Sequence, residues 1–351
     1  MEEVSIIVPM FNCEKSIAKL ITSLLKQTYK NIEILLVNDG CTDRTLEICR
    51  SFSSDSRMKI LFRKHGGVSR ARNTGIKEAH GKFIYFCDAD DYIELDTIEK
   101  MVKAYQKNNV DLVISGHSIE VYLKDNKPYI KNVYYPEKIY HSREEFKKDF
   151  ILLWEKPLLA TVWNKLYVTD IIKNNNIFFE NYDFGEDIKF NMKYFLNISS
   201  VHIISDILYH YIKKENNSLT QKYINNLFEI YKTEYTEFCD FFDLYGISKN
   251  DYEEYLHKRY LECMIRCLKN LTKPSCPLNF KTKLKETRKI INNYLTRICV
   301  KNATFDSVSL KLVNLLFKLK LSLLTLLIFS FLNFIKQKVP KTFSFIKKIF
   351  N

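Results

Sequence analysis

The first 116 residues alternate between two hydrophobic patterns, and this alternation constrains the fold more than any other feature of the sequence. Short apolar runs typical of buried strands lie at residues 4–8, 32–37, 59–62, 83–86 and 110–115. Stretches with helical periodicity separate them, at residues 15–28, from about residue 43, and near 68–79 and 95–107. Strands that alternate with helices predict an α/β fold, Rossmann-like, with a mostly parallel sheet flanked by helices on both faces.

Three of these strands end in polar, turn-forming sequence. The first runs into Pro9-Met10-Phe11-Asn12, the second into Asn38-Asp39-Gly40-Cys41-Thr42-Asp43, and the fourth into Cys87-Asp88-Ala89-Asp90-Asp91. The carboxyl ends of parallel strands lie at one edge of the sheet, which is where such sheets bind ligands. We therefore expect the binding site at this edge.

The carboxylates at these strand ends suggest particular ligands. Asp88 and Asp90 lie on alternate residues after a buried strand, and paired carboxylates of this kind suit Mg²⁺ or Mn²⁺ bridged to a substrate phosphate. The alternative is an acidic, solvated turn. Asp39 has no evident structural role in the sequence and is interpreted as a ligand for a base or ribose, whereas Thr42 or Asp43 caps the next helix.

The segment Gly66-Gly67-Val68-Ser69-Arg70-Ala71-Arg72-Asn73-Thr74-Gly75 places glycines at a helix start and arginines on its first turns. Free backbone N–H groups, the helix dipole and the arginine forks together suit a diphosphate. The alternative is a surface helix with ordinary arginines.

Beyond residue 116 the pattern is looser. Residues 117–220 mix strand and helix signals, and from about 221 to 306 helical spacing dominates, with a break at Pro274 and Pro277. Taken alone, Glu186-Asp187 reads as a pair of acids at a helix N-terminus. Taken alone, His210 reads as a packing residue between two tyrosines.

Five of these segments resemble, in order and at typical spacing, the motifs of glycosyltransferase family 2. They are Val4 to Asn12, Val37 to Asp43, Gly66 to Gly75, Asp88 to Asp91, and Phe184 to Asp187. The resemblance covers residues 1 to about 220. It implies a GT-A fold and an inverting, metal-dependent transfer of a sugar from a nucleotide diphosphate sugar, most often UDP-linked.

The resemblance also implies roles for individual residues. The residues of the nucleotide-sugar site would be Pro9, Phe11, Asp39, Lys64, Arg72, Asp88, Ala89 and Asp90. Within this set Phe11 would stack on uracil, Asp39 would bond its imide, and Asp88 would hold the ribose. Asp90 would bind Mn²⁺ or Mg²⁺, with His210 as a second metal ligand.

For the acceptor side, the resemblance assigns the catalytic base to Asp187. Trp163, Asn164 and Glu186 are expected to shape the acceptor pocket, although Trp163 is equally interpretable as a core residue. The sequence departs from the family at Phe11, where tyrosine is usual, at Cys41, where serine is usual, and at Lys64, where an amide is frequent. Neither tryptophan lies in the Gln-x-x-Arg-Trp pattern of processive synthases, so we expect a non-processive enzyme.

The formal net charge of the chain is +13, and much of the excess lies in the C-terminal tail. No acidic residue occurs from Ser307 to Asn351, whereas this stretch contains the lysines at positions 311, 318, 320, 336, 338, 341, 347 and 348. The charge accompanies apolar sequence and not a basic, aromatic face, so nucleic acid is not expected as a partner. Nine cysteines without Cys-x-x-Cys spacing, and an N-terminus that enters a strand at once, predict a reduced cytoplasmic chain without a signal peptide.

Residues 321–335 of the tail are mostly apolar and are bracketed by lysines. Fifteen helical residues span about 22 Å, which is short of the roughly 30 Å hydrocarbon core of a bilayer. We therefore expect an interfacial helix on an anionic membrane surface, and a similar pairing recurs at residues 343–350. A short tilted span and a helix packed on the enzyme are the alternatives.

Together these patterns predict three regions. Residues 1–220 form a GT-A domain with a nucleotide-binding half (1–116) and an acceptor half (117–220), residues 221–310 form a helical region, and residues 311–351 form a basic membrane-associating tail. The predicted activity is transfer of a hexose or N-acetylhexosamine to a glycan or lipid-linked acceptor in surface polysaccharide synthesis, at the inner face of the cell membrane. The alternative is a catalytically silent nucleotide-sugar-binding protein or a peripheral membrane scaffold.

Overall fold

The computed structural model describes residues 2–122, 128–181, 185–214, 223–305 and 307–338. Phe184 of the fifth motif and residues 343–350 of the tail lie outside this description. The chain forms two compact units, residues 1–216 and residues 217–351.

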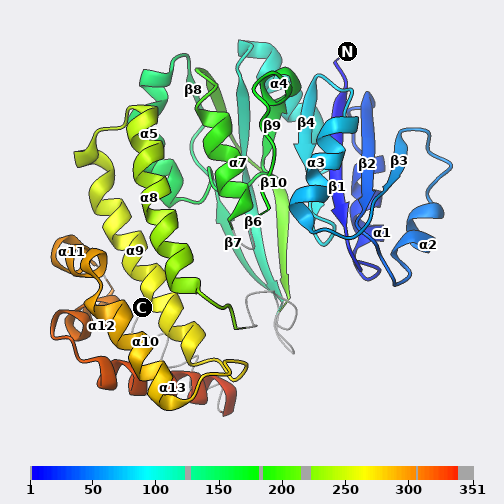
Figure 1. Ribbon diagram of the computed structural model, residues 1–351. Coiled ribbons are helices and arrows are strands. Elements are labelled where there is room, and N and C mark those ends of the chain that lie inside the picture. The colour runs from blue at the N-terminus through cyan, green and yellow to red at the C-terminus, as the bar shows by residue number, and fades with distance from the viewer. Residues whose placement is uncertain (1, 123–127, 182–184, 215–222, 306, 339–351) are drawn as a thin grey trace. The chain divides into compact units, whose positions relative to one another are not determined.

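The first unit is built on one sheet (Figure 1). Its strands are β1 (Val4–Met10), β2 (Ile32–Asn38), β3 (Met58–Phe62), β4 (Phe83–Phe86), β5 (Tyr92–Ile93), β6 (Leu112–Tyr122), β7 (Tyr129–Val133), β8 (Lys138–Tyr140), β9 (Lys165–Val168) and β10 (Val201–Lys214). Its helices are α1 (Ile17–Leu25), α2 (Thr45–Arg50), α3 (Val68–Glu78), α4 (Thr97–Asn108), α5 (Arg143–Glu155), α6 (Thr169–Asn174) and α7 (Glu186–Phe195).

The main path of the sheet has the order β3-β2-β1-β4-β9-β6-β10-β5. The strands β3, β2, β1 and β4 pair in parallel, which confirms the parallel sheet expected from the alternating pattern. Beyond β4 the sheet is mixed, because β9 runs antiparallel to both β4 and β6, whereas β10 runs parallel to β6. The strand β6 crosses residue 116, so the two predicted halves share one continuous sheet.

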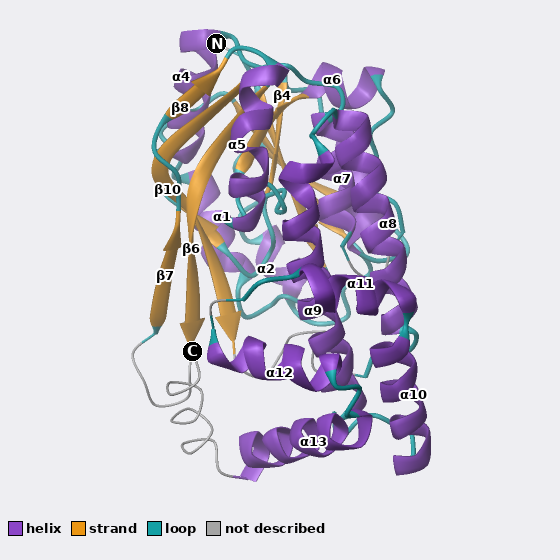
Figure 2. Cartoon of the chain, turned by 90° about the vertical axis from the view of Figure 1, so that its left-hand side faces the viewer, coloured by secondary structure: helices purple, strands orange, loops and turns teal. Residues whose placement is uncertain are grey.

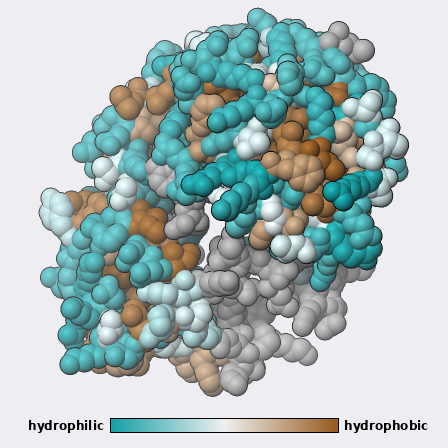
Figure 3. Space-filling model, turned by 45° about the vertical axis from the view of Figure 1, so that its right-hand side comes forward, coloured by the Kyte–Doolittle hydropathy of each residue, from teal (hydrophilic) through white to brown (hydrophobic). Residues whose placement is uncertain are grey.

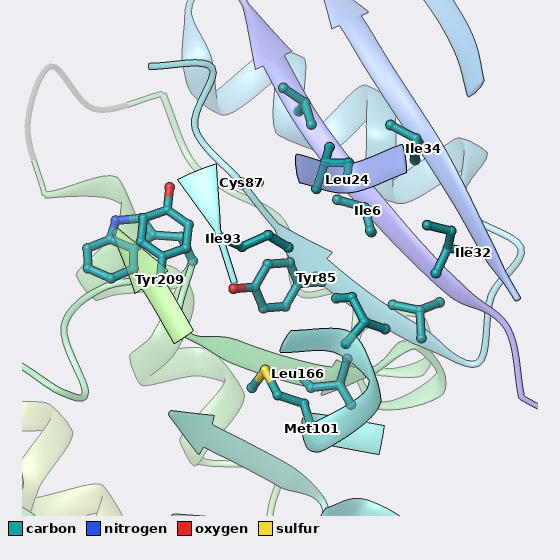
Figure 4. Packing of buried hydrophobic residues seen from close by; sticks show 14 of the residues in the cluster. Ile6, Leu24, Ile32, Ile34, Tyr85, Cys87, Ile93, Met101, Leu166 and Tyr209 are labelled. Carbon is teal, nitrogen blue, oxygen red and sulfur yellow. The ribbon is translucent and has the colours of Figure 1, made fainter. Parts of the chain in front are cut away.

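One face of the sheet packs against α1 and α4. Side chains alternate between the two faces along a strand, and Ile6 of β1 and Tyr85 of β4 both belong to the buried cluster on this side. Leu24 of α1 and Met101 of α4 are buried in the same cluster, as Figure 4 shows. These residues form an apolar core between the sheet and the two helices.

The opposite face is covered by α3 and α7. Gly75 of α3 lies directly over Ile7 of β1, where an added Cβ would be 2.4 Å from the Ile7 Cγ2 atom. Phe86 of β4 packs edge to face against Phe190 of α7, at a ring-centroid distance of 5.5 Å. The two helices therefore meet the sheet beside β4, whose tip carries Asp88.

The second unit is helical (Figure 2). Its helices are α8 (Leu227–Tyr245), α9 (Lys249–Leu271), α10 (Phe280–Asn292), α11 (Tyr294–Asn302), α12 (Val308–Lys318) and α13 (Ser322–Lys338). The break between α9 and α10 contains Pro274 and Pro277, as predicted. The last helix, α13, packs against α9, α10 and α12. None of the helices in the described residues has the length and apolar character needed to cross a membrane.

Candidate active site

The ends of β1 and β2 are tied together by hydrogen bonds between their loops. The backbone N–H of Asp39 donates to the carbonyl of Met10 at 2.9 Å. The side-chain oxygen of Asn12, a residue with φ of 49°, accepts from the N–H of Thr42 at 2.8 Å. The two strand tips therefore form one rigid edge, as expected from their polar sequence.

Asp39 organises the loop that precedes α3. Its side chain is buried and accepts hydrogen bonds from the backbone N–H groups of Gly66 at 3.1 Å and Gly67 at 2.8 Å. It also pairs with Arg63 and with the ring of His65. The view from the sequence that Asp39 has no structural role is therefore wrong: its carboxylate holds the glycine loop.

A stacked pair of rings, Phe11 and His65, lies beside this loop. Phe11 is 49% exposed, and its ring stacks on His65 with a centroid distance of 4.3 Å. Lys64, predicted to contact the nucleotide, is exposed next to His65, and Pro9 is half-buried within β1. His65 was missed because a lone histidine next to Lys64 carries no pattern of its own; only the fold shows that it faces Phe11.

The acidic cluster after β4 divides into two parts. Asp91 is buried and accepts hydrogen bonds from the Tyr209 hydroxyl at 2.6 Å and from the N–H of Ile212 at 2.7 Å, and burial raises its pKa well above the ordinary value. Asp91 is thus an internal anchor to β10. Asp88 is half-buried and Asp90 is exposed, while Ala89 between them is buried. The two carboxylates predicted to bind ligand are the two that solvent reaches.

Arg72 joins both sides of the site. It is 2% exposed, and its guanidinium pairs with Asp88 at 2.9 Å, with Asp187 at 2.6 Å and with Glu186 at 3.3 Å. Burial opposes its charge, but the three carboxylates outweigh this effect and raise the pKa of Arg72. The residue predicted to lie along the nucleotide is therefore the link between the tip of β4 and the start of α7.

Asp187 has the electrostatics of a general base. Burial raises its pKa to about 7; Arg72 opposes the rise, whereas the charges of Glu186 and Asp88 reinforce it. A base whose pKa lies near neutral pH can accept a proton and still be ionised at the working pH. Glu186, predicted on the acceptor side, lies next to Asp187 with its side chain 20% exposed.

The second turn of α7 is hydrogen-bonded to the loop before β9. Asn191, one turn after Asp187, donates from its side-chain nitrogen to the carbonyls of Ala160 at 3.2 Å and Thr161 at 3.1 Å. Its side-chain oxygen accepts from the Tyr167 hydroxyl at 2.7 Å. The sequence analysis missed Asn191, although its i+4 spacing from Asp187 places the two on one helix face.

The structure does not support His210 as a metal ligand. Its Nδ1 lies 2.9 Å from both Glu120 and Ser118, its Nε2 lies 2.8 Å from Glu94, and its ring stacks on Tyr92. Both ring nitrogens are therefore engaged within the protein. The packing interpretation from the residues alone is the one the contacts favour.

Trp163 and Asn164 are core residues. The Trp163 ring is buried and stacks on Tyr209 at 4.2 Å. Asn164 is fully buried, and its amide donates to the carbonyls of Ser115 at 3.0 Å and Leu158 at 3.1 Å. Their predicted contact with an acceptor is therefore not supported, because neither side chain reaches the surface.

The residues present fit a divalent cation bound together with a phosphate. Within the described part of the chain, no cluster of three or more histidine, cysteine or acidic side chains is arranged to hold a metal by itself. Mg²⁺, however, is usually bound through one or two carboxylates together with substrate phosphates. Asp88 and Asp90 offer such a pair.

Comparison with known proteins agrees with this geometry. Residues 5–161 match the family model described as "Glycosyl transferase family 2". The chain is 31% identical over 336 residues to a protein of Bacillus subtilis described as "Uncharacterized glycosyltransferase EpsJ", and the alignment covers 93% of this chain and 95% of that protein.

A second relative has known structures. The chain is 30% identical over 231 residues to the poly(ribitol-phosphate) beta-N-acetylglucosaminyltransferase TarS of Staphylococcus aureus, which covers 64% of this chain and 38% of TarS. The fold matches the crystal structure of TarS residues 1–349 in complex with UDP-GlcNAc with a TM-score of 0.64, at 19% identity, over 93% of this chain and 90% of that one.

A GT-A-like sheet with these carboxylates at its edge is the architecture of an enzyme that transfers sugars, a glycosyltransferase. Within that class, the relationship to EpsJ extends over nearly the whole of both chains. The chain belongs to glycosyl transferase family 2.

Proposed function

We propose that this glycosyltransferase transfers one sugar per encounter, with inversion at the anomeric carbon, from a UDP-linked sugar to a glycan or lipid-linked saccharide. One observation carries the proposal: Asp88 and Asp187, 99 positions apart in sequence, both pair with the buried guanidinium of Arg72. A donor-side carboxylate and a base of near-neutral pKa are therefore neighbours, as a displacement reaction requires.

In the proposed reaction, the Asp187 carboxylate accepts the proton of an acceptor hydroxyl. The hydroxyl oxygen forms a bond to the anomeric carbon on the face opposite the diphosphate. The bond between that carbon and the diphosphate oxygen breaks, and the nucleoside diphosphate leaves with the electron pair. Phe11, stacked on His65, offers a surface for the base.

A divalent cation, Mn²⁺ or Mg²⁺, would neutralise charge that develops on the leaving diphosphate. Asp90 and Asp88 would hold it. The roles of two other residues do not depend on the cation. Arg72 positions Asp187, and Asp39 holds the loop before α3.

The donor and acceptor follow from different observations. UDP-GlcNAc is the first donor to test, because the TarS structure holds it. We infer a glycan or lipid-linked acceptor, in the synthesis of a surface polysaccharide at the inner face of the cell membrane, from the apolar and basic sequence of the tail. A catalytically silent sugar-nucleotide-binding protein would not need the base-like environment of Asp187.

The test is a panel of nucleotide sugars incubated with Mn²⁺ or Mg²⁺ and read out as nucleotide release, with and without lipid-linked acceptors. We expect release from a UDP-sugar, loss of release on chelation of the metal, and loss in Asp187→Asn with UDP binding retained. Asp55→Asn, on the turn before β3, is the matched control and should release nucleotide like the wild type. No release from any donor, or undiminished release from Asp187→Asn, would contradict the proposal.

A further inference from the structure

The helix α12 presents an apolar face to solvent. Val308, Leu312, Leu315 and Leu319 recur at helical spacing and are between 46% and 59% exposed. The buried contacts of α12 come from Leu316 and Phe317, on other sides of the helix. The side of α12 that faces solvent is therefore as apolar as the side that faces the protein. A surface helix of a globular protein normally has a polar side toward solvent.

The next helix, α13, also presents an apolar face to solvent. Its inward side carries Ser322, Thr325, Leu326 and Phe329, all buried. Its outward side includes Leu323, Leu324, Leu327, Phe331 and Phe334, which are between 46% and 62% exposed. The helix is therefore apolar toward solvent as well as toward the protein.

These two faces belong to helices that pack against each other. By contrast, on the face of the molecule in Figure 3, apolar side chains lie in small groups among hydrophilic ones, as is normal for a folded protein. Apolar side chains that follow one another along two neighbouring helices indicate a binding surface, whereas single exposed apolar side chains do not.

The charge beside this surface identifies what binds it. Lys311, Lys318 and Lys320 are exposed at its margin, and no acidic residue occurs in the sequence from Ser307 onward. Leucine and phenylalanine that enter the acyl boundary, with lysines at the headgroups, are the pattern of a helix that lies in a membrane interface. Each lysine near an anionic surface adds about fivefold to the binding constant.

We propose that the outward faces of α12 and α13 bind the surface of an anionic phospholipid bilayer, without crossing it. The place of this membrane contact in sugar transfer rests on the proposed function. The surface itself is formed by side chains of α12 and α13, so its binding to membranes can be measured without donor or acceptor.

The test is sedimentation of the full-length protein with vesicles of phosphatidylglycerol and phosphatidylcholine in equal parts, and with phosphatidylcholine alone. We expect binding to the anionic vesicles, weaker binding at high salt because the charges are screened, and at least tenfold weaker binding for Leu323→Gln with Leu327→Gln. The matched control is Leu152→Gln with Leu244→Gln, which changes two leucines exposed elsewhere, on α5 and α8, and should bind like the wild type.

Three outcomes would overturn the proposal. The first is a wild-type protein that does not sediment with anionic vesicles. The second is a double variant on α13 that binds as well as the wild type while its circular dichroism shows the native helix content. The third is a wild-type protein that is dimeric and does not bind vesicles while the α13 variant is monomeric, which would make the face a contact between copies. Nucleotide release, measured in parallel, reports separately on the proposed function.

Discussion

At the scale of single residues, the charges around Arg72 dominate the electrostatics of the candidate site. Arg72 pairs with two carboxylates at the start of α7 and one at the tip of β4. All four residues were candidates from the sequence, which assigned Arg72 to the nucleotide but did not indicate these pairs. Spacing along a chain reports which residues share a helix or a strand tip, whereas the Arg72 contacts join segments that only the folded sheet brings together.

The raised pKa of Asp187 predicts the pH dependence of the reaction. The base must be ionised, so kcat/KM, which reports the free enzyme, is expected to fall about tenfold per pH unit below an inflection near pH 7. Above the inflection, Asp187→Asn should lower kcat by on the order of 10² to 10⁴. Initial rates at acceptor concentrations well below KM give the kcat/KM profile, and rates at saturating acceptor give kcat; a flat kcat/KM profile from pH 5 to 8 would contradict the assigned base.

Arg72 should set where that inflection lies. Because its positive charge lowers the pKa of Asp187, Arg72→Met should move the inflection to higher pH, and Arg72→Lys should move it less. The Met variant should also lose about 3 kcal/mol of unfolding free energy, near the low end for a broken buried pair because the carboxylates stay 20% to 27% exposed. The pH profile separates the two roles, since a purely structural Arg72 would leave the inflection in place.

At the scale of elements, the contact between α3 and β1 positions this arginine. The alternating pattern was enough to predict the helix from residues 68 to 79 and the strand it covers, because both carry long periodic signals. The close approach of α3 to β1 at Gly75 was not predictable. A glycine inside a helix has more than one structural explanation, and the neighbouring residue is needed to decide between them. Likewise, the burial of Asn164 and the pairing of His210 depend on mixed strands beyond β4 that the looser sequence did not specify.

Gly75→Ala tests the packing of α3. The new Cβ would lie 2.4 Å from the Ile7 Cγ2 atom, so α3 must move away from β1, at a cost of about 1 to 3 kcal/mol in unfolding free energy. Because Arg72 lies on the same helix, nucleotide release should fall as well. Urea denaturation gives the stability change.

The neighbour that causes this cost can be identified by a double-mutant cycle. In an Ile7→Ala background, the contact is largely removed, so Gly75→Ala should cost less there than in the wild type. Thr74→Ala, at the half-buried position before it, is the control and should have the same cost in both backgrounds. Equal costs for Gly75→Ala in the two backgrounds would exclude Ile7 as the obstacle.

At the scale of the whole molecule, the candidate site and both tryptophans belong to the first compact unit. Trp154 and Trp163 are the two tryptophans of the sequence, and both lie before residue 217. Tryptophan fluorescence therefore follows the unfolding of the unit that holds the site. The second unit contains tyrosine and phenylalanine only among its large aromatic residues.

UDP with Mn²⁺ should raise the midpoint of thermal unfolding measured by tryptophan fluorescence. A ligand at one hundred times its Kd stabilises the protein that binds it by about 2.7 kcal/mol. Asp90→Asn should remove the part of the shift that depends on the metal, and Asp96→Asn, an exposed acid before α4, should keep it. A midpoint unchanged by UDP would place the nucleotide outside this unit or exclude its binding.

The shared contacts of Arg72 also bear on how such an enzyme can change over evolution. Loss of Arg72 would leave three carboxylates close together without the cation they share, and loss of a carboxylate would remove one of the ion pairs of Arg72, so single substitutions in this set are penalised. Related sequences should therefore keep or exchange these positions as a group.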